Sequence, residues 1–542
     1  MKNRNLYFSW FIIALLLGVI FKQPLLKFFV ADFSSSEQMD FDKLEEIITL
    51  TETHYVGNVD WDKAISGAIE GMLNSLDPHS VYFDPVQGES NDESFEGKYQ
   101  GIGIQYDVIE GFINVITVIP GSPSEKVGIF AGDIIVEIDG ESAFGISNAE
   151  VPKKLKGPKN SVVEVAIQRE GFDDNLKFEI TRDEIPIYTI NTHFMANDST
   201  GYVWVNRFAN TTADELESAL IKLEKKGMKQ LVLDLRYNGG GYLWQAVKIV
   251  GKFISGRKKV VFTKGRFQKV TDEHFTDDYG KSIDRDFPLV VMINHSSASA
   301  SEIVAGAIQD YDRGVIVGTR SFGKGLVQNE FVLNDESRLR LTVSKYYTPS
   351  GRLIQKPYEN KSINDYYSLA HVGKDSIQNS EVQDSLMVYH TSKGREVFGG
   401  GGIKPDIVVA DSGYTNSPKL TQKLLEKRIF FEVASHYANS HKNIKDNREY
   451  FFEKFEVSDK LFRELQKVAK QKEINFDSEV WNADIPFLKN RLKAEIARSI
   501  WSQNEFYRVI LEHDNQFETA LKSFPKARAI QNQLVKIESK ID

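Results

Sequence analysis

The chain has 542 residues, no cysteine and a formal net charge of −9. This length exceeds what a single hydrophobic core usually holds, so we expect several domains. The lack of cysteine excludes disulfides, a cysteine nucleophile and cysteine-bound zinc. The mild negative charge, without a block of Lys and Arg, argues against a nucleic acid as partner.

The N-terminus has the layout of an export signal. Lys2 and Arg4 precede an apolar run over residues 6–21, and positive charge before such a run is typical of a segment that keeps its N-terminus in the cytoplasm. No small residues follow at the spacing of a cleavage site. We therefore interpret residues 1–30 as an uncleaved signal anchor, with a cleaved signal peptide as the alternative.

The next two segments differ in their hydrophobic pattern. Residues 37–93 carry apolar residues at helical spacing and predict an N-terminal helical segment. Residues 94–185 contain five short β-branched runs separated by glycine, with two short helical stretches among them. This pattern predicts a small β-rich domain.

Strand-like and helix-like runs alternate from residue 186 onward. "QLVLDLRYN" precedes a glycine turn and a helical run, and "PLVVMIN" precedes "SASEIVAGAIQDY", which predicts βαβ units in an α/β core over residues 186–411. Residues 359–396 are polar and irregular, which indicates a surface excursion. Residues 412–542 predict a C-terminal helical region, in which Leu488, Leu492, Ile496 and Ile500 recur every four residues.

The segment "NHSSASASEIVAGAIQD", residues 294–310, places four serines between a strand-like run and a helix-like run. In α/β sheets, functional groups gather at the carboxyl ends of strands, and helix N-termini offer unpaired N–H groups. A serine at this junction can act as a nucleophile whose tetrahedral intermediate those N–H groups stabilise. Helix capping is the alternative, although one cap requires only one serine.

Two residues are candidates for the base that such a serine needs. His295 is close in sequence, but a neighbour at a strand end need not face the serine. Lys324 lies between Gly323 and Gly325, and a lysine among apolar and glycine neighbours loses solvation, so its pKa falls. Residues 318–325 nearly match a phosphate loop, but Gly325 stands where Ser or Thr would bind magnesium and strand-like runs follow, which argues against nucleotide binding.

Five stretches of the chain form an ordered set of motifs: "GAIEGMLNSLDPHSVYFDP", "DLRYNGGGYL", "SSASASEIVAGAIQDYDRGVIVGTRSFGKGLVQ", "KYYTPSGRLIQ" and "GGGIKPDIVV". Together they resemble the C-terminal processing peptidases, also called tail-specific proteases. The resemblance covers about residues 40–410, and it implies a serine endopeptidase with a Ser/Lys pair that needs no cofactor or metal. Two departures are small: Gly239 stands where the family usually has proline, and Ser296 replaces a common glycine.

The family pattern implies a role for each residue of the site. Ser299 corresponds to the nucleophile, Lys324 to the base and Gln328 to the residue that orients the lysine. The oxyanion donors correspond to backbone N–H groups near Gly240 and Ala300. The other serines of the motif are then expected to shape or cap the turn, namely Ser297 and Ser301.

The β-rich domain resembles a PDZ domain. Gly101, Ile102, Gly103 and Ile104 stand where PDZ domains have the loop that binds a terminal carboxylate while the peptide adds as a strand. A plain tight turn is the alternative for these four residues by themselves. The more specific part of the match is "VIPGSPSEKVGIFAGDIIVEIDG".

We therefore expect a multidomain α+β and α/β protein, in which an α/β protease core carries an inserted PDZ domain, an N-terminal helical segment and a C-terminal helical extension. The resemblance implies an endopeptidase that cleaves exported proteins near their C-termini, anchored in the bacterial inner membrane with its catalytic domain in the periplasm, or exported and soluble if the signal is cleaved. Expected partners are peptides with free C-termini and the membrane; a homo-oligomer or a regulatory partner is left open. The alternative is a catalytically silent PDZ scaffold, against which the joint presence of Ser299, Lys324 and Gln328 argues.

Overall fold

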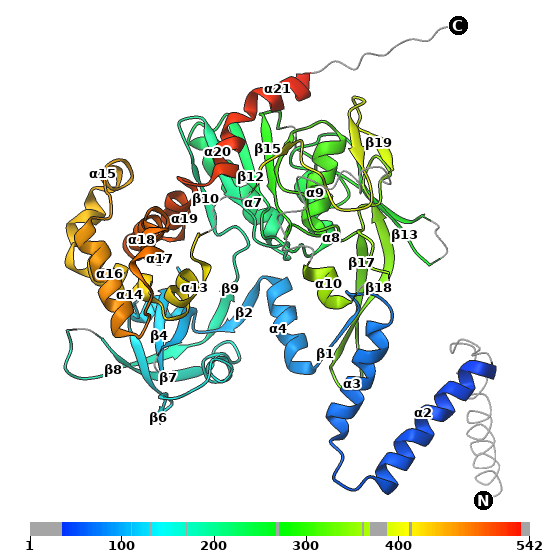
Figure 1. Ribbon diagram of the computed structural model, residues 1–542, viewed down its shortest axis with the longest axis horizontal. Helices are drawn as coiled ribbons and strands as arrows, with labels where there is room; N and C mark the ends of the chain where they lie inside the picture. The colour runs from blue at the N-terminus through cyan, green and yellow to red at the C-terminus, as the bar shows by residue number, and fades with distance from the viewer. Residues whose placement is uncertain are drawn as a thin grey trace, which may run out of the picture. The chain divides into compact units, whose positions relative to one another are not determined.

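The computed structural model describes residues 35–109, 111–130, 132–169, 171–266, 270–283, 285–359, 362–368, 387–410 and 415–532. The predicted signal anchor, residues 1–30, lies outside these ranges. No helix within them is both long and apolar enough to cross a bilayer. The chain forms two compact units, Met1–Leu76 and Asp77–Asp542 (Figure 1).

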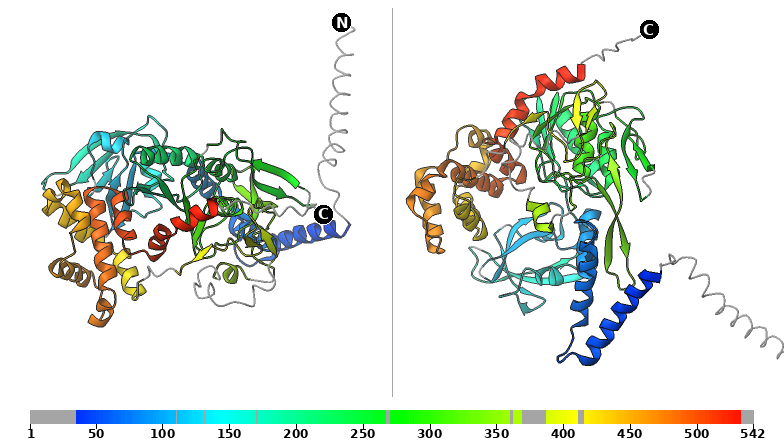
Figure 2. Two further views of the ribbon diagram at one scale, coloured as in Figure 1. Left: turned by 90° about the horizontal axis from the view of Figure 1, so that it is seen from above. Right: turned by 45° about the vertical axis from the view of Figure 1, so that its right-hand side comes forward.

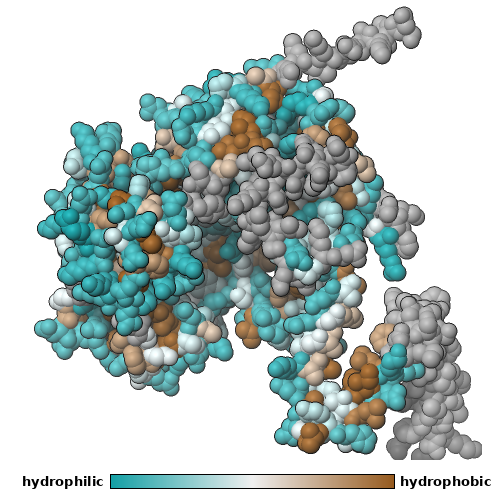
Figure 3. All heavy atoms as spheres, viewed as in Figure 1, coloured by the Kyte–Doolittle hydropathy of each residue, from teal (hydrophilic) through white to brown (hydrophobic). Residues whose placement is uncertain are grey.

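The described part of the first unit is helical, as its hydrophobic spacing predicted. Its two helices are α2 (Ser35–His54) and α3 (Trp61–Asn74). The Asp60 side chain accepts the Lys63 N–H at 3.1 Å and so satisfies one of the N–H groups that a helix start leaves unpaired. Several apolar side chains of α2 are exposed on this unit (Figure 3), among them Phe41, Leu44 and Ile47.

The β-rich domain in the second unit contains the five predicted strands. They form one antiparallel sheet in the order β3-β4-β5-β7-β8, with β6 beside β5, and buried Ile and Val side chains fill its core. Strands β2 and β9, at the two ends of the domain, pair with each other, as expected where an inserted domain leaves its host near the point of entry. The elements are β2 (Lys98–Gly101), β3 (Ile104–Ile109), β4 (Phe112–Val118), α5 (Pro123–Val127), β5 (Ile134–Ile138), β6 (Glu141–Ser142), α6 (Val151–Leu155), β7 (Val162–Gln168), β8 (Leu176–Thr181) and β9 (Asp183–Pro186).

A six-stranded sheet forms the α/β core that the alternation of strands and helices predicted. Its order is β10-β11-β12-β15-β16-β21, and every pair is parallel except β10 with β11. Residues of α7, α8 and α9 join one face of this sheet in a single apolar core. The elements are β10 (Thr192–Met195), β11 (Thr200–Trp204), α7 (Thr212–Lys225), β12 (Gln230–Asp234), α8 (Leu243–Val250), β15 (Leu289–Ile293), α9 (Ala300–Asp310), β16 (Val315–Gly318) and β21 (Ile407–Val408).

A second sheet has the order β1-β18-β13-β14, and β17 also pairs with β18. It contains the strands predicted to follow residue 325. The stretch 359–396 was predicted to be an irregular excursion, and its described residues include the helix α10 and the strand β19, which pairs with β20 at the end of the stretch. The elements are β1 (Val81–Phe83), α4 (Pro85–Glu96), β13 (Lys259–Lys264), β14 (Val270–Phe275), β17 (Leu326–Val332), β18 (Arg338–Tyr347), α10 (Ile363–Ser368), β19 (Val388–His390) and β20 (Glu396–Phe398).

The C-terminal helices pack in two places. Helices α13 to α19 enclose a core of their own, in which Leu488, Leu492 and Ile496 are fully buried as their spacing predicted. Helices α20 and α21 lie on the second face of the six-stranded sheet (Figures 1 and 2), where Phe517 packs edge-on against Tyr202. A largely parallel sheet needs apolar cover on both faces, so these last helices complete the α/β core. The elements are α13 (Pro418–Glu426), α14 (Ile429–Ser440), η1 (Lys442–Asp446), α15 (Arg448–Glu453), α16 (Asp459–Gln471), α17 (Ser478–Asn482), α18 (Ile485–Ile500), α19 (Gln503–Leu511), α20 (Asn515–Lys522) and α21 (Phe524–Asn532).

Candidate active site

Ser299 lies where strand β15 leads into helix α9, at the carboxyl edge of the six-stranded sheet. It is the N-cap residue of α9, and its φ of +55° belongs to a region that non-glycine residues rarely adopt. Ser299 is partly exposed between the buried residues Ala298 and Ala300. The ring of His295, the histidine closest in sequence, lies edge-on to the ring of Tyr237. Of the three serines in the SASAS motif, only Ser299 is therefore partly exposed, and it lies on a strained backbone.

The other two serines of the motif fasten this turn to the turn after β12. The Ser297 hydroxyl donates to the Leu235 carbonyl at 2.8 Å, and the Ser301 hydroxyl donates to the Asn238 carbonyl at 2.9 Å. The Ala298 N–H donates to the same Asn238 carbonyl at 3.0 Å. These hydrogen bonds help to join the two turns, which gives Ser297 and Ser301 a structural role.

The glycines after β12 allow a close approach to Ser299. Gly240 has a φ of +101°, and a Cβ built on it would lie 2.8 Å from the Ser299 Cβ and 3.1 Å from the Ala300 nitrogen. Only glycine fits at this position. The Gly240 N–H donates to the Asn238 side-chain oxygen at 2.9 Å. The two residues expected to supply oxyanion donors are therefore neighbours, and the Gly240 N–H is bonded within its own turn in this structure.

Lys324 and Gln328 are in direct contact. The Lys324 Nζ donates to the Gln328 Oε1 at 2.7 Å. The Gln328 Nε2 donates to the His79 carbonyl, so the amide is oriented with its oxygen toward the lysine. Burial, with a smaller contribution from Arg340, lowers the pKa of Lys324 to about 8 against the opposing effect of the Asp77 and Glu302 carboxylates.

A buried carboxylate that the sequence analysis missed, Glu302, joins the Ser299 turn to the turn that carries Lys324. The Glu302 Oε2 accepts the N–H of Ser299 at 2.8 Å and the N–H of Lys324 at 2.9 Å. Its Oε1 accepts the N–H of Gly323 at 2.7 Å and the hydroxyl of Ser321 at 2.5 Å. Burial outweighs these four donors and raises the pKa of Glu302 to about 7. The Ser-x-x-Glu spacing of a capping box is the signal that would have found it.

A histidine from the start of the second unit also reaches this site, and the sequence analysis missed it. The His79 ring packs edge-on against Phe322 and Tyr366, and its Nε2 lies 2.9 Å from the Tyr366 hydroxyl. Burial lowers the pKa of His79 to about 3, and the nearby Lys324 contributes. A group with so low a pKa accepts protons poorly at neutral pH, so the Lys324 amine is the better base of the two.

The loop expected to bind a peptide carboxylate is closely packed. Residues 101–104 are all buried, and the side chains of Ile102 and Ile104 belong to the core of the β-rich domain. The carbonyl groups of Ile102 and Gly103 accept backbone N–H groups of later residues, each at 3.0 Å. A Cβ built on Gly103 would lie 2.3 Å from the Ser122 Cβ, so this position requires glycine.

Four family models match separate parts of the chain. Peptidase family S41 matches residues 199–365, and the PDZ domain matches residues 115–169. The N-terminal domain of the activating protease CtpB matches residues 30–86, and a family of unknown function, DUF8443, matches residues 420–502. The matches define a serine peptidase that carries a PDZ domain.

Relatives at 34–36% identity share most of their length with the chain. A carboxy-terminal-processing protease of Bartonella bacilliformis is 36% identical over 345 residues, which are 62% of this chain and 78% of the relative. The carboxy-terminal processing protease CtpA of Bacillus subtilis is 34% identical over 352 residues, 64% of this chain and 74% of the relative. The solved photosystem II D1 C-terminal processing protease is 29% identical over 67% of this chain and 86% of that chain, with a TM-score of 0.34. The chain belongs to the C-terminal processing peptidases of family S41.

We predict that Glu302→Gln impairs peptide hydrolysis and removes a pH dependence of stability. The glutamine amide keeps one acceptor oxygen and turns N–H groups toward backbone N–H groups, so we expect kcat to fall by about one to two orders of magnitude with KM little changed. Because the folded pKa of Glu302 lies above its ordinary 4.5, the stability that it contributes is complete below about pH 4.5 and is lost as pH rises through about 7, a change of about 3 kcal/mol.

Denaturant unfolding between pH 4.5 and pH 8 measures the pH dependence of the free energy of unfolding. The wild type should show this dependence on Glu302, and Glu302→Gln should lack it. The exposed Glu449→Gln is the matched control and should leave both kcat and the pH dependence unchanged. Parallel stability curves for the wild type and Glu302→Gln would contradict the shifted pKa, and unchanged kcat would contradict the positioning role.

Proposed function

We propose that the chain cleaves exported polypeptides near their C-termini, with Ser299 as nucleophile and Lys324 as general base. The observation that carries the proposal is the bridge through Glu302: one carboxylate oxygen accepts the backbone N–H groups of both residues. The segment that holds the serine and the segment that holds the lysine are thereby kept together. The lowered pKa of Lys324 and its bond to Gln328 support the same assignment.

The proposed reaction begins with a neutral lysine. With a pKa of about 8, about a tenth of the amine is neutral at pH 7, against roughly one part in 3,000 for a free lysine. The neutral Nζ accepts the proton of the Ser299 hydroxyl while the oxygen attacks the scissile carbonyl carbon. The Lys324 ammonium then donates this proton to the departing amine, and a water molecule releases the acyl group by the same two steps in turn.

The oxyanion of each tetrahedral intermediate is assigned to the N–H groups of Gly240 and Ala300. Ala300 is the first residue of α9, where a helix leaves its N–H groups without helical partners and its dipole favours negative charge. In the proposed reaction the Gly240 N–H exchanges its bond with the Asn238 side chain for one with the oxyanion. The missing proline at Gly239 makes the turn freer to move in this way.

We predict that activity rises with pH with a midpoint near 8, because the base acts only when it is neutral. Ser299→Ala should abolish cleavage of a peptide substrate. Lys324→Ala and Lys324→Arg should each lower kcat by about two to four orders of magnitude, since arginine stays charged in the working range. Initial rates between pH 6 and pH 10 measure these effects.

His295→Ala is the matched control for the base and should keep substantial activity. An inactive His295→Ala variant together with an active Lys324→Ala variant would assign the base to histidine instead. Full activity in Ser299→Ala would contradict the assignment of the nucleophile. If all these variants are properly folded and the wild type hydrolyses no peptide, the alternative of a silent PDZ scaffold gains support.

We propose that the PDZ domain binds substrate tails through the backbone of residues 101–104. A loop of this kind receives a terminal carboxylate while the peptide pairs with the adjacent strand. We predict that amidating the C-terminus of a cleavable peptide weakens its binding to Ser299→Ala protein at least tenfold, because a charge-assisted hydrogen bond contributes about 1.5–3 kcal/mol. Calorimetric titration with the acid and the amide forms tests this, and equal affinities would contradict it.

We further propose that residues 1–30 anchor the protein in the inner membrane, with the peptidase in the periplasm. The support is the charge pattern around the apolar run, together with the lack of a cleavage site after it. We predict that protein isolated from bacterial membranes retains its first residues, which intact-mass measurement or N-terminal sequencing decides. A mature start near residue 30 would indicate a cleaved signal and a soluble exported enzyme.

A further inference from the structure

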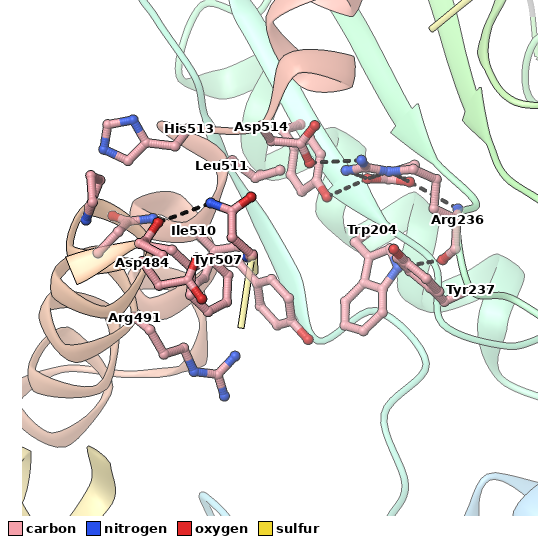
Figure 4. A pocket seen from close by; sticks show the side chains of 17 residues that line it. Trp204, Arg236, Tyr237, Asp484, Arg491, Tyr507, Ile510, Leu511, His513 and Asp514 are labelled. Carbon is pink, nitrogen blue, oxygen red and sulfur yellow. Dashed lines mark hydrogen bonds and ion pairs between the residues drawn. The ribbon is translucent and has the colours of Figure 1, made fainter. Parts of the chain in front are cut away.

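A cavity of about 540 Å³ lies between the α/β core and the C-terminal helices. One wall consists of residues at the carboxyl ends of β11 and β12 and in the turn that follows β12, and the opposite wall comes from α18, α19 and the segments beside them (Figure 4). The volume is within the range of sites that hold small ligands or short peptides. The cavity lies outside the proposed catalytic centre and outside the PDZ domain.

Aromatic side chains from both walls meet in this cavity. The rings of Trp204 and Tyr507 are 4.7 Å apart at an angle of 50°, and Figure 4 shows Tyr507 reaching from the helical side toward the core. The Trp204 Nε1 donates to the Arg236 carbonyl at 3.2 Å, so the indole presents its rings to the cavity. Phe487 and Ile510 add apolar surface, and such a lining suits a large apolar side chain.

Three carboxylates line the cavity, and each already has hydrogen-bonding partners. Asp234 and Asp514 both pair with Arg236, each at 2.7 Å. Asp484 accepts the backbone N–H groups of Asn416 at 2.7 Å and of the next residue at 2.6 Å. These three acids are therefore committed to holding the walls together.

The cation Arg491 is placed differently. It shares the buried carboxylate of Glu495 with Arg498, at 3.2 and 2.6 Å, so one negative charge serves two guanidinium groups. The buried Arg491 Nε has no hydrogen-bond partner among the described residues. A guanidinium in this position is suited to a further carboxylate.

The core wall of the cavity continues directly into the catalytic turns. Arg236 and Tyr237 line the cavity, and the next residue, Asn238, is the one whose carbonyl holds the Ser299 turn through the Ala298 N–H and the Ser301 hydroxyl. A molecule bound in the cavity therefore contacts the segment that fixes the nucleophile.

We propose that this cavity is a second peptide-binding site, which takes a short apolar C-terminal tail with its last side chain against Trp204 and Tyr507 and its free carboxylate at Arg491. The aromatic walls fit the side chain, and the guanidinium fits the carboxylate bidentately. The Asn490 amide, which also lines the cavity, offers a donor and an acceptor for a peptide group. The inference goes beyond tail binding by the PDZ domain and can fail independently of it.

Photo-crosslinking locates the site directly. The probe is a synthetic pentapeptide of alanines that ends in p-benzoylphenylalanine with a free carboxylate, added to full-length Ser299→Ala protein. The inference predicts adducts on Trp204 or within residues 483–514, which peptide mapping by mass spectrometry identifies. Adducts confined to residues 97–183 or to the Ser299 turn, or no adducts, would overturn it.

Variants then test the helical wall with the same peptide. Arg491→Gln should weaken binding of the acid peptide at this site at least tenfold and leave binding of its amide form unchanged. The affinity of Arg491→Lys for the acid peptide should lie between those of the wild type and Arg491→Gln. Ala483→Trp fills the cavity and should remove the adducts of residues 483–514, while Asn482→Trp, at an exposed neighbour outside the lining, should keep them. Equal crosslinking in the wild type, Arg491→Gln and Ala483→Trp would refute the proposed site even if one variant folded poorly.

Discussion

The arrangement of the site depends on one buried carboxylate. Burying an unpaired charge is costly, so a carboxylate in the protein interior persists only where donors surround it. Glu302 has four donors, and they come from three places in the sequence: the nucleophile itself, the lysine turn and the serine that precedes that turn. Removing any of these segments would leave the carboxylate short of partners. The fold therefore stabilises the glutamate and the catalytic geometry together.

The second constraint is the need to cover a parallel sheet on both faces. Helices α7 to α9 supply one cover from within the α/β core, whereas α20 and α21 supply the other from the far end of the chain. The helical region between β21 and α20 is thereby held near the carboxyl edge of the sheet, where Arg236 pairs with Asp514. The closing of the core by its last helices also creates the aromatic cavity, because the same contacts bring Tyr507 to Trp204.

The sequence predicted the features that depend on local patterns and on motifs. The five strands of the β-rich domain, the alternating core and the junction that carries Ser299 follow from hydrophobic periodicity, and the pairing of Lys324 with Gln328 was expected only from the family motif. The contact between His79 and Tyr366 could not be predicted in this way, because these residues are 287 positions apart in the sequence and only the fold brings them together. Glu302 resembled an ordinary helix residue, since its partners in the lysine turn lie about 20 residues away.

The electrostatics of the site reflect a competition that no single residue determines. Burial and Arg340 favour the neutral form of Lys324, whereas Asp77 and Glu302 favour its charged form. His79 adds no charge at neutral pH, because burial keeps its pKa near 3. The pKa values of Glu302 and Lys324, about 7 and about 8, lie close together, so the two groups titrate over the same range and each affects the other. Ionised Glu302 raises the pKa of Lys324, so a rise in pH first ionises the carboxyl group and then removes the proton of a lysine that this carboxylate has made a weaker acid.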